Sequence, residues 1–242
     1  MYGRNDLRAS LAPPPNDRSP TAFKSASYAP FFDHVSDQCA SDQDAKLTRH
    51  WYARGQTMVV CYSKVEAGAV LQRDDQCDEY AVVLPDDGVE VEVSNADSRQ
   101  VASGRSVIFV PPGSSRIVVN KGGRLLRLFT TRSDDLLRLC SNADAYATPD
   151  GNVALFESWP EPVGGYSIRV YSGSVPPEEG RFGRLYRGST IMVNFGGGRV
   201  GPRAPENLSP HHHADFEQYS IALDGDYIHH LRWPWISDST QW

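Results

Sequence analysis

The residues with the clearest chemical potential are His211, His213 and Glu217, which form an H-x-H-x3-E pattern late in the chain. Five of the seven histidines lie between residues 209 and 235. Two histidines at positions i and i+2 of a strand point to the same face, and imidazole nitrogens with a carboxylate oxygen are common ligands of Fe, Mn, Zn and Ni. The pattern therefore predicts a site for one divalent metal ion, without specifying which.

The backbone must turn between His213 and Glu217 if these side chains are to share one ion. A straight strand rises ~3.3 Å per residue and would place Glu217 about 13 Å beyond His213, whereas bonds to a metal are about 2 Å long. Residues 216–223 have a strand-like composition, and the dipeptide Asp224-Gly225 is typical of a two-residue hairpin turn. We therefore expect Glu217 to begin a hairpin strand beside the histidines.

The register of this hairpin predicts which side chains accompany Glu217. A two-residue turn pairs Glu217 with Arg232 and Tyr219 with His230, whereas a three-residue turn reverses the faces. In the first case Tyr219, His230 and Arg232 would orient a substrate or move protons. His230 is alternatively a replacement metal ligand or a packed core residue. Arg232 either neutralises Glu217 or binds a substrate carboxylate.

The late motif resembles the first motif of the cupin superfamily, G-x5-H-x-H-x3,4-E-x6-G. Its closing glycine comes one residue late, and Pro205 stands in place of the leading glycine. The resemblance implies a small β-barrel of the jelly-roll type, in which His211, His213 and Glu217 are three of four ligands to a divalent metal. In the family a second motif supplies the fourth ligand, a histidine, and that motif does not follow here.

An earlier part of the chain, residues 57–131, consists of short segments rich in β-branched and aromatic residues. Turns containing glycine or proline separate these segments. Closely spaced strands without helices between them favour an antiparallel barrel or sandwich. The strictly alternating segment VEVEV at 89–93 indicates a strand with one buried and one wet face.

This earlier part also resembles a cupin barrel, but one in which the metal site has been replaced. Asp74 and Gln76 stand where the first motif has its histidines, and Glu79 lies near the carboxylate position. Ser115 or Arg116 falls where the histidine of the second motif would be. Oxygen ligands alone suit only a hard ion. The alternatives to a metal site are that this domain is structural or that it binds an organic ligand through Arg116.

The expected fold class is all-β, with tandem cupin-like β-barrels and a short helix between them. We divide the chain into a proline-rich extension (1–54), a first barrel with a degenerate site (55–132), a helix and linker (133–180) and a second half with the histidine motif (181–242). Ser133 is the expected helix cap. The second half is too short to close a barrel. Either the chain is a truncated form, a second subunit completes the barrel in a homo-oligomer, most simply a dimer, or this half is an open remnant.

Charge and composition limit the partners and the compartment. The chain has 24 basic and 30 acidic residues, a formal net charge of −6, which argues against nucleic acid as a partner. It has no run of 18 apolar residues that would span a membrane, and charged residues occupy the N-terminal positions where a signal peptide is apolar. The four cysteines lack C-x-x-C spacing. We expect a cytoplasmic protein with free thiols and no membrane partner.

Two functions from different classes are compatible with these patterns. The first is a metal-dependent cupin enzyme acting on a small polar or carboxylate-bearing substrate, with dioxygenase-like chemistry preferred over isomerase or lyase chemistry. The second is a non-catalytic bicupin that binds a small ligand or serves as an oligomeric assembly module. Retention of metal by the protein favours the first, and stabilisation by an organic ligand without metal favours the second.

Overall fold

The computed structural model describes residues 29–33, 47–176, 184–195, 200–202, 213 and 215–229. The chain forms two units, one of residues 34–217 and one of residues 1–33 with 218–242. The first unit carries every strand and the helix found in the described residues. In the second unit, the described stretches 29–33 and 218–229 contain no regular element. Within the described part of the chain, no helix has the length and apolarity needed to cross a bilayer.

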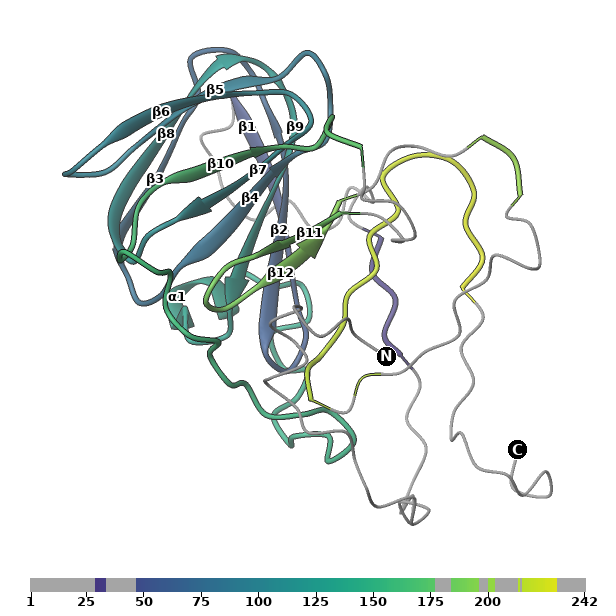
Figure 1. Cartoon of the computed structure of the whole chain (residues 1–242). Helices are drawn as coiled ribbons and strands as arrows, with labels where there is room; N and C mark the ends of the chain where they lie inside the picture. Colours follow the sequence, from purple (N-terminus) through teal and green to yellow (C-terminus); the bar gives the residue numbers. More distant parts are fainter. Residues whose placement is uncertain are drawn as a thin grey trace. The chain divides into compact units, whose positions relative to one another are not determined.

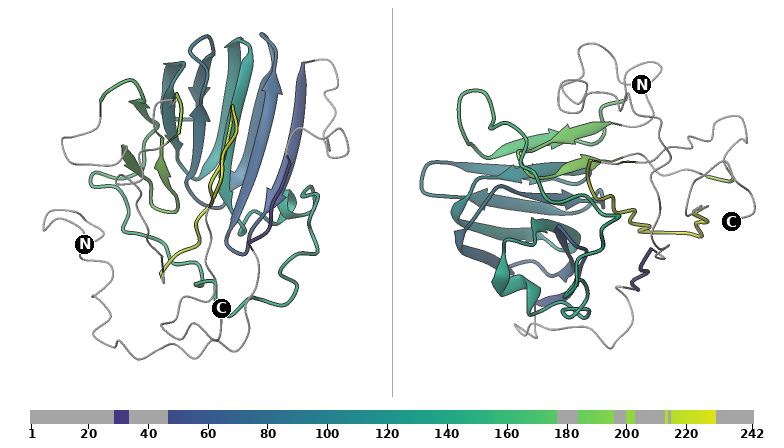
Figure 2. Two further views of the ribbon diagram at one scale, coloured as in Figure 1. Left: turned by 90° about the vertical axis from the view of Figure 1, so that its right-hand side faces the viewer. Right: turned by 90° about the horizontal axis from the view of Figure 1, so that it is seen from below.

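Two antiparallel sheets make up most of the larger unit (Figure 1). The six-stranded sheet has the order β1 (Thr48–Arg54), β2 (Met58–Val65), β9 (Gly123–Thr130), β4 (Tyr80–Leu84), β7 (Ser106–Val110) and β10 (Arg169–Ser172). The four-stranded sheet has the order β3 (Val70–Gln76), β8 (Gly113–Lys121), β5 (Glu90–Ser94) and β6 (Arg99–Ser103). A separate hairpin pairs β11 (Leu185–Arg187) with β12 (Met192–Asn194). Figure 2 shows the six-stranded sheet from two further directions.

The pairing of the strands is nested around the β5–β6 hairpin. Strand β5 pairs with β6, β4 with β7, β3 with β8 and β2 with β9, always antiparallel. Along the chain, the strands from β2 to β5 and from β6 to β9 alternate between the two sheets. A double sheet wound in this way is a jelly roll. The all-β jelly roll expected from the sequence is therefore confirmed for the first half of the chain.

The core lies between the two sheets and follows the alternation of the sequence. In β5, Val91 and Val93 are fully buried while Glu90 and Glu92, which alternate with them, are partly exposed, which confirms the strand with one wet face. The strands β4 and β7 are buried on both faces. Large side chains such as Tyr80 and Phe129 fill the interior, and burial of a large apolar side chain stabilises the fold by roughly 1.5–3 kcal/mol.

Two segments outside the predicted first barrel join its larger sheet. Residues 48–54, expected in the N-terminal extension, form β1 and pair with β2. Residues 169–172, expected in the linker, form β10 and pair with β7. Strand composition predicts that residues 169–172 are extended, but the choice of sheet edge depends on distant strands. The described residues show one barrel, and the four-part division with a second barrel stays a prediction.

The expected helix is present but short. Helix α1 (Asp134–Leu137) begins after Ser133, as expected, but the Ser133 side chain makes no capping hydrogen bond. Instead the Ser133 hydroxyl accepts a hydrogen bond from Gln76 Nε2 at 2.9 Å. Ser133 is therefore the N-cap residue, as predicted, but its side chain bonds to Gln76 and not to the helix backbone.

The predicted hairpin around Asp224-Gly225 is not formed. Residues 215–229 are described and contain no strand. Gly225 has the positive φ of +78° that a tight turn needs, but Asp224 has no positive φ. A two-residue type I′ turn requires positive φ at both central positions. The hairpin prediction was therefore wrong over the residues that the structure describes.

Candidate ligand-binding site

A cavity of about 430 Å³ opens between β1, β3, β9 and helix α1. Its volume falls in the range of small-molecule sites. Three sheet strands and the helix each contribute a part of the wall: Thr48, His50 and Tyr52 from β1; Val70, Leu71, Gln72 and Arg73 from β3; Arg127 from β9; and Asp135, Leu136 and Leu139 from the helical segment. The cavity thus combines charged, neutral polar and apolar walls.

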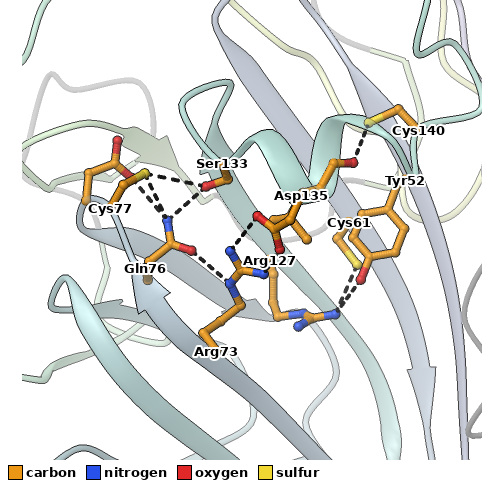
Figure 3. A network of polar contacts seen from close by, with 11 residues as sticks. Tyr52, Cys61, Arg73, Gln76, Cys77, Arg127, Ser133, Asp135 and Cys140 are labelled. Atoms are coloured by element: carbon orange, nitrogen blue, oxygen red, sulfur yellow. Dashed lines mark hydrogen bonds and ion pairs between the residues drawn. The ribbon is translucent and has the colours of Figure 1, made fainter.

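Arg127 is the buried cation of this cavity. Alternation along β9 turns Leu125, Arg127 and Phe129 into the barrel, and Arg127 is only 4% exposed. Its Nη2 donates to Tyr52 Oη at 3.1 Å and to Cys61 Sγ at 3.3 Å (Figure 3). Among the described residues, its Nε has no acceptor and no carboxylate forms an ion pair with it. A guanidinium held by neutral groups alone attracts an anion.

The charge of Arg127 persists despite its burial. Burial by itself lowers the pKa of the guanidinium, but the neighbouring polar groups of Cys61 and Tyr52 raise it further than burial lowers it, so that the pKa lies above its ordinary value. An arginine side chain in a protein does not lose its proton at accessible pH. The interior of the barrel therefore holds a permanent positive charge.

Neutral polar groups continue from Arg127 along β2 and β1. The Cys61 sulfur lies 3.4 Å from Ser63 Oγ, and Ser63 Oγ lies 2.7 Å from His50 Nδ1. Both His50 and Ser63 are buried. Deeper in the barrel, Tyr80 and Ser115 share a hydrogen bond of 3.0 Å, and burial raises the pKa of Tyr80. This chain of donors and acceptors makes one side of the interior polar.

Arg73 and Asp135, which both line the cavity, form a charge pair (Figure 3). Two bonds, from Nη1 to Oδ2 at 2.5 Å and from Nη2 to Oδ1 at 3.1 Å, make the pair bidentate. Arg73 Nε also donates to Gln76 Oε1 at 2.8 Å. The Arg73 guanidinium lowers the pKa of the Asp135 carboxyl below its ordinary value. The pair joins β3 to α1, and its two opposite charges sum to zero.

The positions that resemble the first cupin motif do not converge in the barrel. Asp74 is exposed and accepts a hydrogen bond from Gln72. Gln76 is buried and donates to Ser133. Glu79 is buried and binds Arg169 instead of facing the cavity. In the part of the chain that the structure describes, no three His, Cys, Asp or Glu side chains form a group suited to a metal ion.

Arg116, which the sequence suggested as a contact for an organic ligand, does not face the interior of the barrel. Ser115 points inward and is buried, whereas Arg116 on the same strand is exposed. Successive residues of a strand point to opposite faces, so one of these two had to lie outside. A ligand inside the barrel would therefore meet Arg127 and not Arg116, which was one of the two alternatives left open for this domain.

Glu79, which directly precedes β4, binds two residues that follow β9 in the chain, Arg169 and Ser189. Its carboxylate accepts hydrogen bonds from Arg169 Nη2 at 2.6 Å, from the Ser189 amide at 2.7 Å and from Ser189 Oγ at 3.2 Å. A Cβ atom at Gly188 would lie 2.8 Å from Glu79 Oε2, so only glycine allows this close approach. Glu79 is fully buried. This carboxylate is a structural clamp with all of its charge compensated.

The late histidine motif is described only in part. Both Glu217 oxygens are engaged by the β1–β2 turn: the Gln56 amide donates at 3.0 Å, and the Thr57 amide and hydroxyl each donate at 2.8 Å. The His213 ring stacks on Phe216 with centroids 4.1 Å apart. The remaining predicted site residues are Tyr219, which is partly exposed, and His211, His230 and Arg232, which lie outside the described residues. The metal site therefore stays a prediction.

The cavity residues carry no sequence motif, and only one signal could have identified them. The segment RLLRLFTT places Arg127 at the same parity as Leu125 and Phe129, on the apolar face of a strand. A charge on that face is unusual unless it serves a site. His50 and Tyr52 share one face of β1, but their approach to β3 and α1 depends on the fold.

Comparison with known proteins identified similar structures only. No family model matches the chain, and no curated protein matches it. KdgF from Halomonas sp. is 16% identical with a TM-score of 0.36, and the match covers 42% of this chain and 96% of that chain. For an RmlC-like cupin from Shewanella frigidimarina the identity is 16%, the TM-score 0.36 and the coverage 46% and 96%. For the Cnp3 cupin domain of Schizosaccharomyces pombe they are 14%, 0.30, 39% and 73%. Over less than half of its length, the chain is thus similar to cupin structures.

Proposed function

We propose that the barrel binds a small organic anion, whose negative group is held by Arg127. The observation that carries this proposal is the burial of the Arg127 guanidinium beside a cavity, with its Nε unpartnered by any described residue. An uncompensated charge inside a protein costs several kcal/mol. A bound carboxylate would remove that cost and accept a charge-assisted hydrogen bond.

The rest of the cavity suits the body of such a ligand. Besides Arg127, the lining includes neutral polar side chains such as Gln72 and apolar side chains such as Leu71 and Leu136. A small-molecule site is usually an apolar cavity with a few placed polar groups. These walls support a ligand with one anionic end and a partly apolar body, bound without covalent chemistry.

Binding is tested by thermal shift and calorimetry with short carboxylic acids. We expect pentanoate and hexanoate to stabilise the wild-type protein and to have no effect on Arg127→Met. The matched control is Arg116→Met, which removes an exposed arginine from the outside of the same barrel and should bind as the wild type does. If the Arg127→Met protein folds, by its circular dichroism, and still binds the acids equally well, the proposal is wrong.

A second candidate function is a metal-dependent enzyme, supported by the H-x-H-x3-E spacing of the sequence. In it His211, His213 and Glu217 would hold a divalent ion, and Tyr219, His230 and Arg232 would orient the substrate. A bound ion would supply Lewis-acid chemistry, or dioxygenase-like chemistry if it is iron. In the described residues Glu217 accepts hydrogen bonds from Gln56 and Thr57, and a bound ion would have to share this carboxylate with them.

Metal analysis of the protein without an affinity tag tests this candidate. We expect one equivalent of metal in the wild-type protein and a large loss in His211→Ala if the motif binds an ion. The control His50→Ala removes a histidine of the barrel instead. A wild-type protein that retains no metal after incubation with Fe, Mn, Zn or Ni would contradict the metal-dependent function.

A further inference from the structure

We infer that Asp135 makes the barrel cavity selective for ligands with a single negative charge. This inference rests on the proposed binding of an organic anion at Arg127 and adds the class of ligand, a monocarboxylate with an apolar body. Asp135 does this without touching the carboxylate, because it occupies the second arginine of the cavity, Arg73.

The charges around the cavity balance except for one. The lining includes two arginines and one carboxylate, Arg73, Arg127 and Asp135. Arg73 and Asp135 neutralise each other through two parallel bonds, and bidentate pairs of this kind are the strongest that arginine makes with a carboxylate. Arg127 is left as the single uncompensated charge among the described lining residues. One anionic group on the ligand completes the balance.

The two arginines are close enough for one ligand to reach both. Their Cζ atoms lie 5.4 Å and 5.8 Å from the centre of the same Phe129 ring. The two guanidiniums are therefore separated by no more than the sum of these distances. A second carboxylate on a short chain would arrive at Arg73, where it would meet the carboxylate of Asp135. Like charges in such proximity repel strongly when they are partly shielded from water.

Four apolar side chains of the lining, Val70, Leu71, Leu136 and Leu139, would contact the aliphatic body of a ligand. Leu71 and Leu136 are buried, and Val70 is 41% exposed. These side chains would cover a hydrocarbon chain extending from Arg127. A charged end placed there would lose hydration without gaining a free cation. Both the charge balance and the apolar lining thus select against dicarboxylates.

Arg73 is held in place independently of Asp135, which makes the inference testable. Its Nε donates to Gln76 Oε1, and Gln76 is itself bound to Ser133. Its guanidinium also lies over the Phe129 ring. The substitution Asp135→Asn therefore removes the negative charge while leaving the arginine in place. The cavity then presents two cations to a ligand.

The experiment compares hexanoate with adipate, which have the same chain length and one or two carboxylates. Dissociation constants are measured by calorimetry for the wild type, Asp135→Asn and the control Asp134→Asn, which removes the neighbouring exposed carboxylate. We expect the wild type and the control to favour hexanoate by at least about tenfold, and Asp135→Asn to bind adipate about tenfold or more tightly than the wild type does. The double variant Arg73→Gln/Asp135→Asn, which has Arg127 as its only cavity cation, should return to the wild-type preference.

The outcomes separate the inference from the function on which it rests. If the wild type binds hexanoate and Asp135→Asn leaves the ratio of the two affinities unchanged, the inference is wrong and binding at Arg127 stands. The same holds if the wild type binds adipate as tightly as hexanoate. If the wild type binds neither acid, or Arg127→Met binds both as well as the wild type, the proposed function fails and the selectivity fails with it.

Discussion

Three of the described arginine side chains, Arg73, Arg127 and Arg169, differ in what balances their charge. Arg169 is paired with the buried Glu79, and Arg73 with the half-exposed Asp135. Arg127 has neutral partners only among the described residues. Because a buried ion pair mostly offsets its own desolvation, the first two are structural. The third retains an attraction for an external anion.

The ion pair of Asp135 gives a stability contribution that depends on pH. Arg73 lowers the pKa of Asp135 from its ordinary value of 3.8. Its contribution is therefore present above the unfolded-state pKa and is lost as the pH falls through the lower pKa of the folded state. We expect Asp135→Asn to lower the free energy of unfolding at pH 7 by at most about 1 kcal/mol, since the carboxylate is half exposed. Urea unfolding should show this difference shrinking as the pH falls below 3.8 and through the lower pKa of the folded state.

A difference between the two proteins that stayed constant from pH 7 to pH 2 would contradict this assignment. It would mean that the substitution acts through packing at α1 and not through the charge of the carboxylate. The Asp134→Asn variant gives the reference, because Asp134 is exposed on the same short helix.

At the scale of elements, the Glu79 clamp joins β4 to β10 and to the turn that follows β11. We expect Glu79→Gln to lower the free energy of unfolding by about 3–5 kcal/mol, because it leaves the Arg169 guanidinium partly buried without a counter-charge. The control Glu92→Gln removes a carboxylate of the exposed pair with Arg99 and should cost less than about 1 kcal/mol. Urea unfolding measures both.

Removal of the whole clamp should be milder than removal of one side. The double variant Glu79→Gln/Arg169→Met has no uncompensated charge, and we expect it to recover part of the lost stability. If the loss of stability in the double variant equals the sum of the losses in Glu79→Gln and Arg169→Met, the pair acts through packing alone.

Glu217 attaches the end of the larger unit to the β1–β2 turn. Its carboxylate accepts hydrogen bonds from the backbone amides of Gln56 and Thr57. We expect Glu217→Ala to increase the hydrogen-exchange rate of both amides about tenfold or more, since each loses its acceptor. The control Glu157→Ala removes an exposed carboxylate and should leave both amides unchanged. Unchanged exchange in Glu217→Ala would contradict the attachment. It would mean that the wild-type Glu217 carboxylate is available to a metal.

The strands could be predicted from the sequence because their signals are local. Alternation gave the buried face of β5, and composition gave the extended segments of the barrel. The hairpin at Asp224-Gly225 failed for a related reason: the dipeptide permits a tight turn, but strands form only where a partner backbone is available. Local sequence specifies what a segment can do, and tertiary structure selects among the possibilities.

The site could be predicted much less well, because its contacts join residues far apart in the chain. Arg73 meets Asp135 from 62 residues away, and Glu79 meets Ser189 from 110 residues away. No spacing rule encodes such pairs. The resemblance to cupin motifs placed Gln76 at a histidine position and Glu79 near the carboxylate position of the first motif, but it did not specify that one contacts Ser133 and the other Arg169.

For the whole molecule, the nested strand pairing has a consequence for the order in which the protein assembles. The β5–β6 hairpin brings together neighbouring segments, and each pair outside it closes a longer loop, ending with β2 on β9. Loops of greater length cost more entropy to close, and sheets dominated by distant contacts fold slowly. Cys61 and Arg127 face each other across this outermost pair. The cavity beside Arg127 is therefore expected to be the last part of the barrel to form, and the proposed ligand could bind only at the end of folding.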